Sequence, residues 1–274
     1  ALPKKQLAGE ILALSPRTVP RVTIPAPEIS AEAYLVRIAG ERHALLSRRE
    51  LKRMKPASLT KLMTAALAVE EMGPSEIIPF SRGAKEVEAI ISNAEADETF
   101  LRDNALTLAL VSSANDAAQA LAEAIGRKRG GHTFAEAMDR TVALMNEKAA
   151  AIGMGSTHFV NPVGLDDPEH FMSAGDVAVL MEYILRQHQD IAALSRMSEA
   201  TVSSREGSAY AVENTDDLLK EFPAILASKT GFTEGARGTL ALAYPVKPHA
   251  TAIIVLLGSR DRMSDGRKLI RWLE

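Results

Sequence analysis

The sequence predicts an α/β protein of the α+β type: an antiparallel sheet built from both termini, flanked by helices, with an inserted all-helical lobe. Short apolar runs bounded by Gly or Pro occur within residues 33–47 and again within 225–258, and such runs are typical of strands. The middle third is rich in alanine and leucine at helical spacing. Because the connections between the last apolar runs are too short for crossover helices, their strands should pair antiparallel.

Each helix and strand is predicted from the residues at its boundaries and from the spacing of its apolar residues. Residues 33–39 and 43–47 predict a hairpin joined by a tight turn. After Pro56, a helix is expected that opens with the capping-type residue Ser58 and stops before Gly73. The remaining helices are expected at residues 103–125, 133–152, 171–189 and 265–274, and the remaining strands at 225–231, 238–244 and 250–258.

A chain of 274 residues suffices for one large domain or two small ones. Residues 1–27, rich in proline and basic residues without a sustained period, predict an N-terminal arm. Residues 28–274 predict a single domain. Its sheet subdomain should comprise about 28–65 and 200–274, and its helical subdomain about 66–199.

Composition excludes several classes of protein. With 32 basic and 35 acidic residues the formal charge is −3, which argues against a nucleic-acid partner. The absence of cysteine excludes thiol nucleophiles, disulfides and thiolate metal sites. The six histidines lack metal-ligand spacing, so no metal site is expected. No segment resembles a membrane span or a signal peptide, and neither a Gly-x-Ser-x-Gly elbow nor a phosphate-binding loop occurs.

Ser58 and Lys61 are the first candidates for chemistry. They lie three positions apart on a predicted helix, so their side chains project from one face about a turn apart. A lysine can activate a serine only as a neutral amine, which requires a lowered pKa. The alternative is that Ser58 is only a helix cap and Lys61 a solvated side chain.

Two further motifs follow in the chain. Ser113 and Asn115 lie in a polar break between two helical stretches, and Lys229, Thr230 and Gly231 end an apolar strand. Taken singly, the first motif is also consistent with a helix cap, and the second with a strand end and turn. The sequence contains one Ser-x-x-Lys, one Ser-x-Asn and one Lys-Thr-Gly, in that order, which argues against coincidence.

The ordered motifs resemble those of the serine penicillin-recognising enzymes, and most closely the low-molecular-mass D-alanyl-D-alanine carboxypeptidases. PASLTKLMTAALAVE is similar to that family's nucleophile helix, VSSANDAAQALAE to its second motif and KTGFT to its third. Residues 157–180 resemble a connecting stretch typical of these carboxypeptidases. The resemblance covers residues 28–272 and implies a β-lactamase/transpeptidase-like fold for a penicillin-binding peptidase domain.

The resemblance also implies roles for individual residues. Ser58 would be the nucleophile and Lys61 its base, while Ser113 and Asn115 would relay protons and hold the substrate amide. Lys229 and Thr230 would bind the carboxylate side of the substrate. The backbone N–H groups of Ser58 and Phe232 would form the oxyanion hole. The remaining residues expected near the substrate are Gly231 and either Arg260 or Arg262.

The chain departs from the family pattern after KTGFT. The family commonly has an Ala-Gly pair, whereas this chain has Ala236-Arg237-Gly238. Arg237 is therefore expected near the mouth of the cleft, either as a solvated turn residue or as a further contact to a substrate carboxylate. Residues 92–97 also lack the family's usual glycines, so the loop beside the nucleophile is expected to differ.

The resemblance implies a serine D,D-carboxypeptidase that removes the terminal D-alanine of a peptidoglycan stem peptide through a Ser58 acyl-enzyme. It implies no cofactor, covalent inhibition by β-lactam antibiotics and an extracytoplasmic location, with the signal peptide absent from this chain. Three alternatives remain open: a D,D-endopeptidase acting on cross-links, a β-lactamase and a non-catalytic peptidoglycan-binding module.

Overall fold

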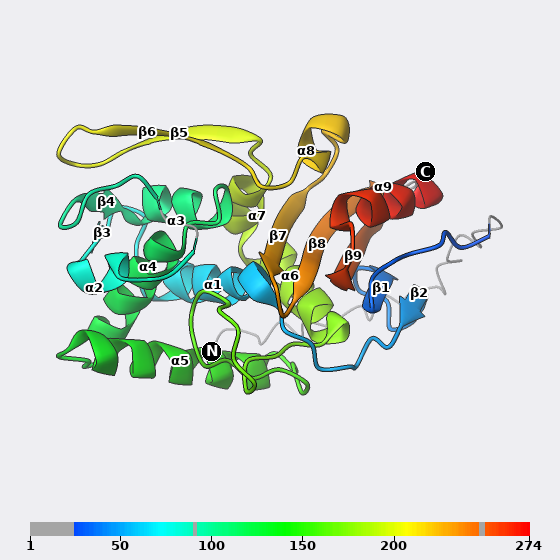
Figure 1. Cartoon of the computed structure of the whole chain (residues 1–274), viewed down its shortest axis with the longest axis horizontal. Coiled ribbons are helices and arrows are strands. Elements are labelled where there is room, and N and C mark those ends of the chain that lie inside the picture. The colour runs from blue at the N-terminus through cyan, green and yellow to red at the C-terminus, as the bar shows by residue number, and fades with distance from the viewer. Residues whose placement is uncertain (1–24, 90–91, 247–249) are drawn as a thin grey trace, which may run out of the picture.

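A computed structural model describes residues 25–89, 92–246 and 250–274. Most of the predicted arm lies outside these residues. The centre of the fold is an antiparallel sheet in the order β2-β1-β9-β8-β7. Its strands come from both termini, as predicted, and Figure 1 shows them side by side. They are β1 (Ala33–Ile38), β2 (Ala44–Arg48), β7 (Ala227–Thr233), β8 (Arg237–Val246) and β9 (Ala250–Ser259).

The two faces of the sheet are covered by different helices. On β8, Leu240 and Leu242 face one cluster with α9 (Arg262–Leu273) and α8 (Leu218–Glu221). The alternate residues Ala241 and Ala243 face the larger cluster, which contains α1 (Lys61–Glu71) and α6 (Ala174–Gln187). This alternation is what a strand buried on both faces requires.

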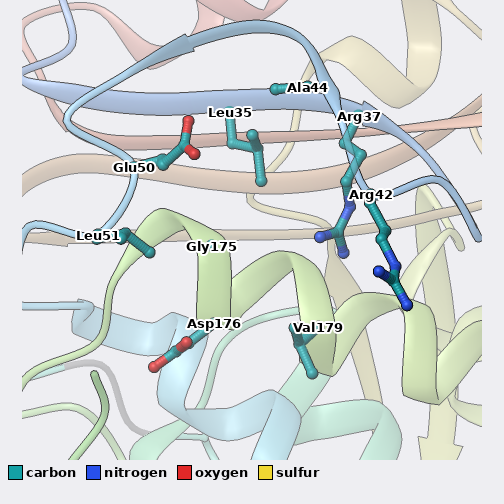
Figure 2. Close-up of a pocket in the computed structure, with 9 residues that line it drawn as sticks. All are labelled: Leu35, Arg37, Arg42, Ala44, Glu50, Leu51, Gly175, Asp176 and Val179. Carbon is teal, nitrogen blue, oxygen red and sulfur yellow. The ribbon is translucent and has the colours of Figure 1, made fainter. Parts of the chain in front are cut away.

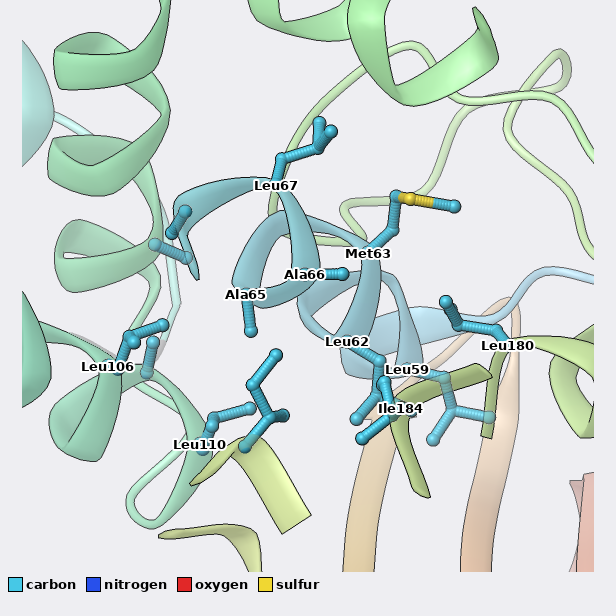
Figure 3. Close-up of a cluster of buried hydrophobic side chains, with 14 of the residues drawn as sticks. Leu59, Leu62, Met63, Ala65, Ala66, Leu67, Leu106, Leu110, Leu180 and Ile184 are labelled. Atoms are coloured by element: carbon cyan, nitrogen blue, oxygen red, sulfur yellow. The ribbon is translucent and has the colours of Figure 1, made fainter. Parts of the chain in front are cut away.

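Helix α1 lies at the centre of the helical lobe. It follows the 3₁₀ turn η1 (Ala57–Thr60) and is buried nearly all round, as Figure 3 shows for Leu62, Met63 and Ala66. A helix that is apolar on every side belongs inside a protein. The other helices of the lobe are α2 (Arg82–Lys85), α3 (Arg102–Leu110), α4 (Asn115–Lys128), α5 (Phe134–Ala151) and α7 (Gln189–Ser195). None of the described helices is both long and apolar enough to cross a bilayer.

The fold class is confirmed, and the structure adds two small sheets. Strands β3 (Ile77–Pro79) and β4 (Thr99–Leu101) pair within the lobe that was expected to be all helical. Strands β5 (Glu199–Ser203) and β6 (Ala209–Glu213) form a hairpin beside α3 that does not join the main sheet. Three-residue strands are too short to show an alternating pattern, which explains why β3 and β4 were missed.

The start of the first helix also differs from the prediction. Ser58 is the second residue of η1, whose N-cap is Pro56, and no side chain caps that turn. Ser58 is therefore not a helix cap. Its hydroxyl remains available for other contacts.

Glu98 ties the β5–β6 hairpin to the lobe. This buried carboxylate accepts hydrogen bonds from the Glu95 N–H (2.8 Å), the Ser204 hydroxyl (2.9 Å) and the Tyr210 hydroxyl. Burial raises the pKa of Glu98, but these hydrogen bonds outweigh it and lower the pKa to about 2.

We expect this contact to stabilise the protein in a pH-dependent way. Because the pKa of Glu98 is lower in the folded chain, its contribution is complete above about pH 4.5 and is lost as the pH falls toward 2. Glu98→Gln should therefore lower the unfolding free energy near neutral pH and flatten its acid dependence, measured by urea unfolding. The exposed Glu199→Gln on the same hairpin is the control; identical acid profiles for wild type and Glu98→Gln would contradict this role.

Candidate active site

Ser58 lies where the sheet meets the helical lobe. The preceding residue, Ala57, has φ of +49°, a left-handed conformation that is rare for a residue with a side chain. The Thr60 hydroxyl donates to the Ala57 carbonyl (2.9 Å) and contacts His170 Nε2 (2.8 Å). The unusual backbone is thus held by surrounding contacts, which is typical of functional sites.

Lys61 is the centre of the site. Its Nζ lies 2.9 Å from Ser58 Oγ, 2.7 Å from Asn115 Oδ1 and 2.9 Å from the Val163 carbonyl, and 1% of the residue is exposed. Burial, followed by the charge of Lys229, holds the pKa of Lys61 well below 10.5. A neutral amine has two N–H groups and one lone pair. If the two carbonyl oxygens accept its N–H groups, the lone pair faces Ser58, as a general base requires.

The second motif lies between α3 and α4. Ser113 has φ of +63°, and Asn115 is the first residue of α4. The Asn115 amide accepts from Lys61 and donates to the Glu88 carbonyl (2.7 Å), which fixes its orientation. Ser113 Oγ accepts from Lys229 Nζ at 3.0 Å. One short turn therefore contacts both lysines.

Lys229 is the second buried lysine. It also donates to the Thr230 carbonyl (2.9 Å), and 1% of the residue is exposed. Burial and the charge of Arg262 lower the pKa of Lys229 to about 7. The structure thus brings together all five residues expected to be catalytic: Ser58, Lys61, Ser113, Asn115 and Lys229.

Strand β7 passes against the nucleophile. A Cβ atom at Gly231 would lie 2.7 Å from the Ser58 nitrogen and 2.6 Å from Thr239 Oγ1, so only glycine leaves room there. The next residue, Phe232, is 62% exposed. Thr230 is 2% exposed, and its hydroxyl lies 2.6 Å from that of Thr215.

The structure distinguishes the three candidate arginines. Arg262 begins α9, and its charge acts on Lys229 and on the buried Asp216. Its Nε is buried and has no hydrogen-bond partner among the described residues. Arg260 is exposed and bonds through its backbone to Ser30. Arg237 is also exposed, and its charge acts on the pKa of Glu32.

Three contacts around the site could not be predicted from the sequence. These are the Val163 carbonyl at Lys61, the Thr215 hydroxyl at Thr230, and Asp216, which accepts from Ser228 Oγ at 2.5 Å. Each joins segments whose pairing depends on the fold, so no local spacing could reveal it. Among residues 25–89, 92–246 and 250–274, no group of three or more acidic or histidine side chains is arranged to hold a metal.

The sheet, the helical lobe and a serine beside a buried lysine at their junction define a penicillin-recognising serine enzyme. The D-alanyl-D-alanine carboxypeptidase family model, peptidase S11, matches residues 21–261, and the chain belongs to this family.

Similar proteins agree with this assignment. D-alanyl-D-alanine carboxypeptidase DacB2 of Mycobacterium tuberculosis is 28% identical over 222 residues, which is 80% of this chain and 72% of that protein. A D-alanyl-D-alanine endopeptidase of Pseudomonas aeruginosa is 30% identical over 269 residues, covering 96% of this chain and 83% of that protein. A solved D-alanyl-D-alanine carboxypeptidase from M. tuberculosis has a TM-score of 0.79 at 26% identity, with 91% of this chain and 92% of that chain covered.

The buried state of Lys229 has a measurable consequence for stability. In the unfolded chain its pKa is near 10.5 and in the fold about 7, so the unfolded state binds the extra proton between these pH values. Stability should therefore rise with pH across this window, by up to about 1.4 kcal/mol per pH unit from this group. We expect Lys229→Met to reduce that slope in urea unfolding, whereas Lys128→Met, on the exposed end of α4, should not. Equal slopes in all three proteins would show that Lys229 stays protonated in the fold.

Proposed function

We propose that this chain is a serine D,D-carboxypeptidase that removes the terminal D-alanine from peptidoglycan stem peptides. The observation that carries the proposal is the Lys61 amine, buried and 2.9 Å from Ser58 Oγ. Family membership supports the same reaction. We also propose that residues 28–274 form one penicillin-binding peptidase domain.

The proposed reaction has two acyl-transfer steps. Ser58 Oγ attacks the carbonyl of the penultimate D-alanine and passes its proton to Lys61. The charge on the carbonyl oxygen is stabilised by the backbone N–H groups of Ser58 and Phe232. The leaving D-alanine amine takes up a proton, relayed from Lys61 through Ser113. Water then attacks the Ser58 ester, which releases the shortened peptide and restores the hydroxyl. No cofactor enters this sequence.

The terminal carboxylate needs a cationic partner beside the scissile bond. We propose Lys229, Thr230 and Arg262 for this role. The charge of Arg262 acts on Lys229, and Gly238 supports this choice over Arg260. A Cβ atom at Gly238 would lie 3.2 Å from Arg262 Cβ, so the glycine leaves space for the arginine stem.

A second candidate is a D,D-endopeptidase that cleaves cross-links. The 30% identity to the P. aeruginosa endopeptidase supports this second candidate. The same residues would act on the same type of bond in either reaction. Cleavage of purified cross-linked dimers, compared with that of monomeric pentapeptide, separates the two activities. A β-lactamase would release hydrolysed penicillin instead of holding a stable adduct, and a binding module would form no adduct.

The proposed substrate also sets the expected location. Because peptidoglycan lies outside the cytoplasmic membrane, we propose an extracytoplasmic enzyme. Its partners would be stem peptides and, as covalent inhibitors, β-lactam antibiotics.

Penicillin labelling tests the nucleophile and the base together. Mass spectrometry should find an adduct on the Ser58 peptide of the wild type and none in Ser58→Ala. Lys61→Arg should lose both labelling and peptidase activity although the charge is kept, because a guanidinium is always protonated and cannot accept the serine proton. Near wild-type acylation by Lys61→Arg would remove Lys61 as the base, and labelling of Ser58→Ala would remove Ser58.

The two neighbouring arginines offer a matched test of carboxylate binding. Arg262→Gln should raise the KM for peptides ending in a free carboxylate, with a smaller effect on their amidated counterparts. A charge-assisted contact contributes about 1.5–3 kcal/mol, so kcat/KM should fall roughly tenfold or more. Arg260→Gln is the control. If Arg260→Gln had the larger effect, or if both substrate types lost activity equally, the assignment to Arg262 would be wrong.

A further inference from the structure

The loop between β2 and η1 has a high density of cations. Residues 48–55, from the last residue of β2 through the loop, read RRELKRMK and contain one acidic residue, Glu50, in a chain whose formal charge is −3. The loop leads directly to Ser58. In Figure 1 it runs beside the turn between β7 and β8. Two segments that are far apart in the sequence, each carrying cations, therefore lie side by side.

These cations converge on a single carboxylate. Arg49 Nη1 lies 3.5 Å from Glu32 Oε1, and Lys52 Nζ bonds to the same oxygen. The hydrogen bond from Lys52 and the charges of Lys52, Arg49 and Arg237 hold the pKa of Glu32 below its usual value. Glu32, Arg49, Lys52 and Arg237 are called the Glu32 cluster below. Arg49 and Lys52 pair with this one carboxylate and the charge of Arg237 also acts on it, so the cluster has an excess of positive charge at the surface.

Glu50 does not cancel this excess. Its side chain lines a pocket of about 180 Å³ together with Arg37, Arg42 and residues of α6. Figure 2 shows Arg37 and Arg42 side by side at the opposite end of that pocket. Glu50 thus lines this pocket, whereas Arg49 and Lys52 pair with Glu32.

The Glu32 cluster is tied to the rim of the candidate active site. Lys55, at the end of the same loop, lies 3.8 Å from Asp166 Oδ2. Asp166 also accepts hydrogen bonds from the Thr233 hydroxyl (2.8 Å) and the Gly235 N–H (3.0 Å), both in the β7–β8 hairpin. The loop and the hairpin that carries Arg237 are therefore held together within a few residues of Ser58.

We propose that the Glu32 cluster is a docking surface for polymeric peptidoglycan, where it binds carboxylates of stem peptides neighbouring the one that is cut. The inference rests on the proposed function. Stem peptides bear repeated carboxylates, and arginine binds carboxylates with a planar pair of donors. Arg49 and Lys52 have side chains that are 56% and 44% exposed, so a polymer can reach them.

The position of the cluster favours a polymer over a membrane. Both anionic polymers and anionic lipid surfaces attract exposed cations. A membrane lying on the Glu32 cluster would also cover the adjacent rim of the site, which the substrate must reach. A polymer strand can extend past the rim and still present one peptide to Ser58.

Cosedimentation with insoluble peptidoglycan tests the surface without requiring catalysis. In a Ser58→Ala background at low ionic strength, Arg49→Gln combined with Lys52→Gln should weaken binding about three- to tenfold, and added salt should remove the difference. Glu32→Gln should have the opposite effect and tighten binding. The matched control is Lys128→Gln with Arg129→Gln: these side chains are 42% and 50% exposed, each is paired with a carboxylate, and the charge change is the same.

Turnover completes the test. With Ser58 intact, the Arg49 and Lys52 double variant should hydrolyse a soluble pentapeptide and acylate with penicillin at wild-type rates. Unchanged sedimentation, equal losses in the control, or equal losses on the soluble peptide would overturn the inference. The inference would also be overturned if the Arg49 and Lys52 double variant lost binding to anionic phospholipid vesicles while its binding to peptidoglycan stayed intact. Failure of the proposed function would appear separately, as a wild type that does not hydrolyse the soluble pentapeptide.

Discussion

The arrangement of the site depends on burying the Lys61 amine. Removing an ammonium from water costs several kcal/mol. Burial therefore lowers the pKa of Lys61 and favours its neutral form. Its polar contacts come from η1, the start of α4 and the loop at Val163, which are far apart in sequence. Those three segments must be in place before the amine can be both buried and hydrogen-bonded. The helical lobe is therefore part of the chemistry and more than a cover for the sheet.

The two buried lysines are coupled through the turn that separates α3 from α4. Ser113 accepts from Lys229 and Asn115 accepts from Lys61, so a shift of this turn would disturb both contacts. The charge of Lys229 also lowers the pKa of Lys61. Protonation of one lysine consequently disfavours protonation of the other. In the proposed mechanism, this coupling would let Lys229 act as the cation that attracts a carboxylate while Lys61 acts as the base.

The sequence predicted the residues of the site better than it predicted their surroundings. Helical spacing placed Ser58 and Lys61 together, polar motifs in the sequence singled out Ser113, Asn115 and Lys229, and the family resemblance gave these residues their expected roles. The contact between Thr215 and Thr230 could not be foreseen, because it depends on how the segment before α8 lies beside β7. The proposal of Arg262 over Arg260 also rests on the structure. The two residues lie where β9 ends and α9 begins, and of the two only Arg262 has a charge that acts on Lys229.

Cations occur in two places near Ser58, in a chain whose formal charge is −3. Lys229 and Arg262 act on each other and on the buried Asp216, while the charges of Asp217 and Asp261 also act on Arg262. The Glu32 cluster contains three cations and one carboxylate. Fields from such local excesses add within about a Debye length, roughly 8–10 Å at physiological salt. Buried cations are screened least by salt, so under the proposed mechanism Lys229 and Arg262 would act on the scissile end of a substrate. The exposed cations of the Glu32 cluster would act earlier, while a carboxylate-rich polymer approaches. In this proposal cations serve both capture at the surface and alignment beside Ser58, and the two effects would differ in their sensitivity to salt.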